Sequence, residues 1–75
     1  MHISDTIVYF HKHMQPEQRN RIETQLRMMD GVIAPRFVPN KEKLLFIAYN
    51  PEKVQAARFR EIFSHMGLES SIVGM

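Results

Sequence analysis

The pattern of apolar and polar residues along the chain predicts four β-strands. Short runs rich in β-branched and aromatic residues span residues 6–11, 32–38, 44–49 and 68–73. Pro35 lies inside the second run. Because proline has no backbone N–H to donate, this strand is expected at an edge of the sheet. Residues 39–43, between the second and third runs, are polar and predict a turn.

Two stretches with helical periodicity separate these strands. The first begins at Pro16, where a missing N–H is harmless, and ends at Gly31, which can adopt the left-handed conformation that closes a helix. The second is expected to begin with Asn50 as N-cap and Pro51 as its first residue, and to end at Gly67. Their apolar stripes consist of Ile22, Leu26 and Met29 in the first helix and Phe59, Ile62, Phe63 and Met66 in the second.

The order of these elements is strand, helix, strand, strand, helix, strand. It predicts an α+β fold, a ferredoxin-like βαββαβ sandwich with a four-stranded antiparallel sheet and two helices on one face. No linker or repeat interrupts the pattern, so residues 1–75 are expected to form a single domain.

The side of the sheet that the helices leave open is predicted to be apolar. The residues expected to face the helices are Val8, Phe10, Leu45, Ile47 and Tyr49. Alternation along the strands then directs outward Ile7, Tyr9, His11, Leu44, Phe46 and Ala48, together with Ile33, Pro35 and Phe37 of the second strand. An open sheet face is normally polar, and apolar patches mark association sites. We therefore expect a homodimer contact or a protein partner at Tyr9, Ile33, Phe37, Leu44 and Phe46.

Composition and charge narrow the function classes. The formal net charge is only +2, and the chain contains no cysteine, which excludes disulfides, thiolate metal sites and thiol catalysis. No apolar run approaches the ~20 residues of a membrane span, so no membrane insertion is expected. The first residues lack the features of a secretory signal, and we expect a cytoplasmic location.

The sequence favours a binding module over an enzyme. Acidic residues are scattered, and three glycines leave no phosphate-binding loop. RNA binding is a further alternative, because RNA-recognition motifs share this fold and stack bases on aromatic residues of the first and third strands, where Tyr9 and Phe46 stand here. The charge and the departures from that motif at Lys43 and Leu44 do not favour nucleic acid as a partner.

Three short motifs resemble the heavy-metal-associated domain. They are Asp30-Gly31-Val32, the strand-to-helix junction Tyr49-Asn50-Pro51-Glu52-Lys53-Val54, and His65-Met66-Gly67-Leu68. The resemblance implies the same βαββαβ fold and a role in metal transport or homeostasis, as a metal chaperone or beside a metal-transporting ATPase. That family binds soft metal ions through a Met-x-Cys-x-x-Cys loop after the first strand. In this chain the two cysteine positions fall on Gln15 and Gln18, or, one residue further along, on Pro16 and Arg19.

Other soft ligands gather around the same loop. The loops after the first strand and before the fourth lie at one end of this fold; His11, His13 and Met14 belong to the first, and His65 lies beside the second. Imidazole and thioether suit Cu(I), and imidazole alone suits Cu(II), Ni(II) or Zn(II). His11, His13, Met14 and His65 are therefore a candidate site for a copper, nickel or zinc ion. The alternative is a solvent-exposed strand end without a ligand.

Overall fold

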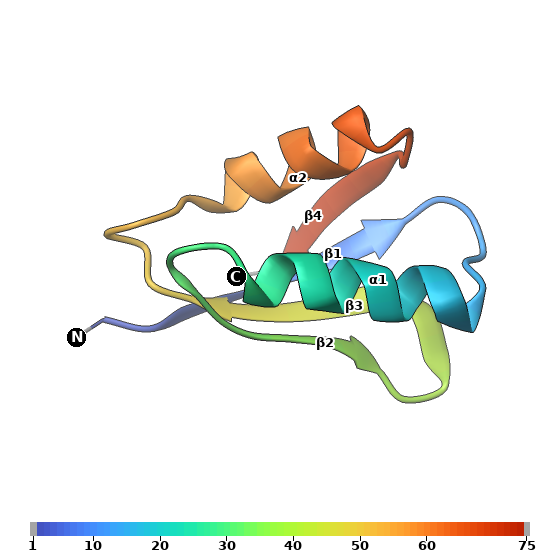
Figure 1. Ribbon diagram of the computed structural model, residues 1–75, viewed down its shortest axis with the longest axis horizontal. Helices are drawn as coiled ribbons and strands as arrows, with labels where there is room; N and C mark the ends of the chain where they lie inside the picture. The colour runs from blue at the N-terminus through green and yellow to red at the C-terminus, as the bar shows by residue number, and fades with distance from the viewer. Residues whose placement is uncertain (1, 75) are drawn as a thin grey trace.

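The computed structural model describes residues 2–74 and has the predicted βαββαβ order (Figure 1). The elements are β1 (Ser4–Phe10), α1 (Pro16–Arg27), β2 (Val32–Val38), β3 (Lys41–Tyr49), α2 (Ala56–His65) and β4 (Ser70–Gly74). The strands form one antiparallel sheet in the order β2-β3-β1-β4, and both helices cover the same face of it. The α+β, ferredoxin-like prediction is confirmed.

The core lies between this sheet face and the two helices. Its buried apolar residues are Val8, Phe10, Met14, Ile22, Leu26, Leu45, Ile47, Tyr49, Val54, Phe59 and Phe63. Aromatic rings join the layers edge to face, Phe10 with Phe63 at 4.9 Å and Tyr49 with Phe59 at 5.4 Å between ring centroids. The inward set predicted for the first and third strands is confirmed.

The predicted start of the second helix is wrong by several residues. Asn50 caps a single turn instead: its Oδ1 accepts a hydrogen bond from the Glu52 N–H at 2.9 Å, and its backbone oxygen accepts those of Lys53 and Val54. The chain then becomes extended at Gln55, the N-cap residue, and α2 begins at Ala56. This interruption lets Val54 bury its side chain in the core, a tertiary contact that overrides the local capping signal.

The predicted orientation of the second strand is also wrong. A register shift between Val32 and Ala34 reverses the alternation, so that Pro35 pairs with Ile47 and Phe37 pairs with Leu45, both inward-facing residues of β3. Pro35 is consequently buried. The Phe37 ring lies 5.9 Å from that of Phe10, on the helix side of the sheet.

Two other predictions for β2, its edge position and the exposure of Ile33, are confirmed. The strand lies at an edge of the sheet, as its proline predicted. Ile33, within the irregular stretch, is exposed as expected. The turn to β3 is shorter than predicted, because Asn40 adopts a positive φ of 63° and β3 already begins at Lys41.

Candidate functional site

The first candidate site is the loop between β1 and α1, where His11 continues the open face of the sheet. Its backbone N–H donates to the Glu69 oxygen at 3.1 Å, which ties the loop to the residue before β4. Its Nε2 lies 2.9 Å from Ser71 Oγ on β4, and its ring lies 5.6 Å from the ring of Tyr9. The imidazole therefore already has a hydrogen-bond partner on the neighbouring strand.

The side chains of His13 and Arg19 connect the same loop to Glu42 near the start of β3. His13 Nδ1 lies 3.0 Å from Glu42 Oε2, and Arg19 Nη1 lies 3.6 Å from the same oxygen. The Arg19 guanidinium also donates to the backbone oxygen of Met14 at 2.7 Å. A cation from α1 thus lies in the loop and holds its backbone through a charge-assisted hydrogen bond.

The other two candidate ligands lie apart from these. The Met14 side chain is 1 % exposed and belongs to the core. His65, the last residue of α2, is exposed and lines a shallow surface pocket with Arg60 and Ser64. Among the residues that the structure describes, no group of three or more histidine, aspartate or glutamate side chains is arranged to hold a metal ion.

The second candidate site is the open face of the sheet. Ile7 pairs with Phe46 and Tyr9 with Leu44 across the two central strands, all on the side away from the helices. Ala34 and Arg36 of β2 pair with Ala48 and Phe46 and extend this face at one edge. On the central strands Tyr9 is 37 % exposed, and Ile7, Leu44 and Phe46 are partly exposed. Ile33 and Val73, in the irregular stretches of the two edge strands, are 46 % and 60 % exposed. Apolar side chains therefore meet solvent on this face.

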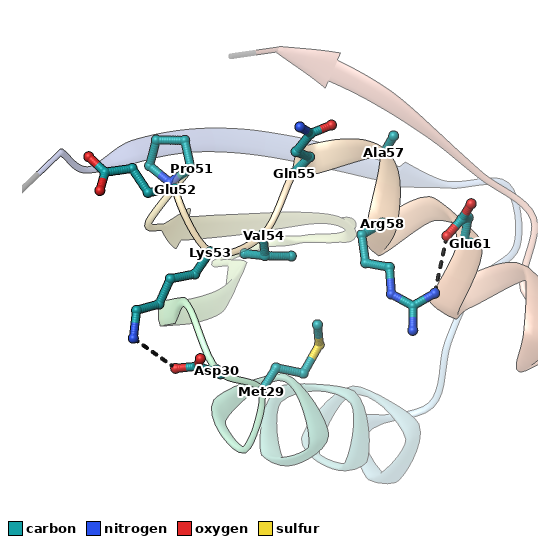
Figure 2. A pocket seen from close by; sticks show the side chains of 10 residues that line it. All are labelled: Met29, Asp30, Pro51, Glu52, Lys53, Val54, Gln55, Ala57, Arg58 and Glu61. Atoms are coloured by element: carbon teal, nitrogen blue, oxygen red, sulfur yellow. Dashed lines mark hydrogen bonds and ion pairs between the residues drawn. The ribbon is translucent and has the colours of Figure 1, made fainter.

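A groove at the end of the molecule opposite the first loop was not predicted from the sequence (Figure 2). It has a volume of 510 Å³ and lies between the end of α1 and the start of α2, with Met29 and Val54 between two ion pairs. Lys53 Nζ is 3.4 Å from Asp30 Oδ1, and Arg58 Nη1 is 3.1 Å from Glu61 Oε1. Four of the five charged side chains that line the groove are paired, and the carboxylate of Glu52 adds one negative charge.

Comparison with known proteins gives matches in structure but not in sequence. No protein-family model matches the chain, and no curated protein matches it. The N-terminal domain of a potential copper-translocating P-type ATPase from Bacillus subtilis, in its Cu(I)-loaded state, matches with a TM-score of 0.84 and 19 % identity, over 97 % of this chain and 90 % of that chain. The copper transporter domain CCC2A of yeast matches with a TM-score of 0.79 and 26 % identity, over 92 % of this chain and 93 % of that chain. The copper-binding domain of HMA7, a P-type ATPase, also gives 0.79, with 18 % identity over 93 % of each chain.

The chain has the heavy-metal-associated fold. It is a form without the cysteine loop, since its sequence contains no cysteine. No helix among the described residues is long and apolar enough to cross a bilayer.

The residues at the positions where the heavy-metal-associated resemblance placed cysteines stabilise the start of α1 and the backbone of the first loop. The Gln15 N–H donates to Gln18 Oε1 at 3.1 Å, which caps α1, and Pro16 is its first residue. Arg19 holds the loop through the oxygen of Met14. In both alignments the side chains at these positions therefore support local structure and supply no thiolate.

Replacing Arg19 with glutamine is expected to lower the free energy of unfolding by about 1–2 kcal/mol, because a charge-assisted hydrogen bond to the loop backbone is lost. Urea unfolding measures the loss, and faster amide exchange in residues 13–15 would locate it. The matched control is Arg27→Gln, which removes the i,i+4 ion pair between the exposed Arg27 side chain and Glu23 and is expected to cost at most about 0.5 kcal/mol. Equal losses for the two variants would contradict a special role of Arg19.

Proposed function

We propose that this chain is a non-catalytic association module of metal-transport systems that works through its open sheet face. The observation that carries the proposal is the apolar face itself, where Tyr9, Leu44 and Phe46 lie on the central strands away from both helices. The setting is suggested by the structural matches, which are domains of copper transporters. These matches support a metal-transporting ATPase as the system in which the chain works.

The contacts of the first loop argue against a dedicated metal carrier. Binding through Met14 would require its side chain to leave the core. Binding through His13 would compete with Glu42 and bring a metal cation near the guanidinium of Arg19. Without a thiolate, the remaining imidazoles are separate surface ligands, which bind soft metals weakly.

The metal half of the proposal is tested by an amide and imidazole NMR titration with Cu(I), Ni(II) and Zn(II) at neutral pH. We expect no saturable change at one ion per chain. Saturation at one equivalent with shifts at His11 and His13 would overturn the proposal and restore a carrier function. A His13→Gln variant separates binding at the loop from binding at His65.

A second candidate function is weak binding of a copper, nickel or zinc ion at the exposed imidazoles. It is favoured by the 3.0 Å separation of His13 Nδ1 and Glu42 Oε2, which places an imidazole and a carboxylate side by side. The same titration tests it. This candidate predicts shifts at His13 and Glu42 and none at the methyl group of Met14, whereas the site with all four candidate ligands predicts that Met14 responds as well.

The association half is tested with a photo-reactive phenylalanine analogue in place of Phe46, in cells that produce the chain. We expect a discrete protein adduct that is lost when Leu44 is replaced with serine. The matched control position is Met28, which is 81 % exposed and lies just beyond α1. Adducts of equal yield at the two positions, or none at position 46, would contradict association through the open face.

A further inference from the structure

Four side chains at the centre of the open face form a square with aromatic rings on one diagonal. On β3 these are Phe46 and Leu44, and on β1 they are Ile7 and Tyr9. The register pairs Phe46 with Ile7 and Tyr9 with Leu44, so each ring has an aliphatic neighbour across the strands and another along its own strand. Because β1 and β3 are the two central strands, this square lies in the middle of the face.

This arrangement is complementary to itself. If a second copy is turned over onto the face about a twofold axis that lies in the plane of the sheet, passes through the centre of the square and runs along or across the strands, the two diagonals exchange. An axis along the strands brings Phe46 of one copy over Ile7 of the other, and an axis across the strands brings it over Leu44. In both cases every aromatic ring meets an aliphatic side chain, and no ring is forced directly onto its own copy.

The charges around the square also favour a second copy over a charged partner. Arg36 lies beside Phe46, and Asp5 lies beside Ala48, so charged side chains of both signs border these apolar residues. A surface built for RNA or for a strongly acidic or basic protein would present an excess of one sign. A surface without an excess of one sign is compatible with an isologous contact, because the same patch must accept itself and like charges would repel their own copy.

We propose that the chain forms a face-to-face homodimer in which Phe46 of each copy packs against Ile7 or Leu44 of the other. This inference rests on the proposed association function and identifies the partner at the open face as a second copy of the chain. Four strands about 4.8 Å apart and about six residues long give a face of roughly 400 Å² in projection. Two such faces give roughly 800 Å², below the roughly 1,200 Å² of stable specific interfaces and in the range of weak, transient contacts, so the dimer is weak, with a dissociation constant in the micromolar range or above.

Sedimentation velocity from low micromolar to millimolar protein measures the association directly. We expect a monomer–dimer equilibrium whose dissociation constant rises at least about tenfold in Phe46→Ser, because a central aromatic anchor is lost. Tyr9→Ser, on the other aromatic position, is expected to act in the same direction. Met28→Ser, at an exposed site outside the sheet, should leave the constant unchanged. Circular dichroism verifies that each variant is folded.

Cross-linking tests the geometry, since the absence of cysteine makes every introduced thiol unique. With a short bis-maleimide, a mixture of Phe46→Cys with Ile7→Cys or with Leu44→Cys should link faster than Phe46→Cys alone. Faster linking of Phe46→Cys alone would overturn the arrangement, and so would a dimer that both serine variants leave intact. A chain that remains monomeric at millimolar concentration, but still gives position-46 adducts of another mass in cells, would overturn the homodimer and leave the association function standing. If the chain neither dimerised nor gave adducts at position 46, both the homodimer and the association function would be overturned.

Discussion

Replacing Met14 with alanine is expected to lower the free energy of unfolding by about 2–5 kcal/mol. The side chain is 1 % exposed and packs in the core beneath the first loop, so its removal deletes apolar contacts and leaves a cavity. A domain of this size has a total stability on the order of 5 kcal/mol, and the variant should be largely unfolded at moderate urea concentrations. Urea unfolding followed by circular dichroism measures the loss.

Two companion variants make this result specific. Met14→Leu conserves volume and is expected to cost less than about 1.5 kcal/mol, although it removes the thioether sulfur. Met28→Ala, at a side chain that is 81 % exposed, should change stability by no more than about 0.5 kcal/mol. If Met14→Ala were as stable as the parent chain but altered copper affinity, Met14 would be a ligand and its assignment to the core would fail.

Replacing Gly31 with alanine is expected to lower the free energy of unfolding by about 2–3 kcal/mol. Its φ of +99° is one that residues with a side chain adopt only under strain, at a cost of about 1–3 kcal/mol. A Cβ atom would also lie 2.9 Å from Lys53 Cβ and 3.0 Å from Val54 Cγ1. The turn before α2 would have to move, although the Asn50 N–H is fixed by a 2.7 Å hydrogen bond to the Gly31 oxygen.

Gly67 supplies the matched control for this substitution. Its φ of +79° is also positive, but a Cβ atom there would have nothing within 4 Å. Gly67→Ala is therefore expected to cost about 1 kcal/mol, from backbone conformation alone. Thermal and urea unfolding of the two variants separate steric contact from conformation. If the two variants lost equal free energy of unfolding, the close contact of Gly31 with the turn would not contribute to stability.

The local pattern was sufficient to predict the order of the elements. Period-two and helical spacing give all four strands and both helices, because these periods follow from backbone geometry and hold within each segment. The inward residues of β1 and β3, such as Val8 and Leu45, follow from simple alternation. The edge position of β2 followed from Pro35 alone.

Errors arose where a distant residue decides a local choice. Asn50 and Pro51 are residues typical of a helix N-terminus, but burial of Val54 in the core ends the helical conformation after one turn. One irregular stretch in β2 reverses which residues face inward, and moved Phe37 from the predicted partner surface to the helix side. A shift of one residue has this effect because side chains alternate with a period of two.

From the sequence alone follow the fold class, the absence of thiolate chemistry and the apolar character of the central open face at Tyr9, Leu44 and Phe46. Only the tertiary structure decided how the first loop is used. It buries Met14, pairs His13 with Glu42 and engages His11 with Ser71, a residue sixty positions away. Residue types reveal which atoms can bind a metal or a partner, but whether those atoms are free depends on contacts between segments that are distant in the chain.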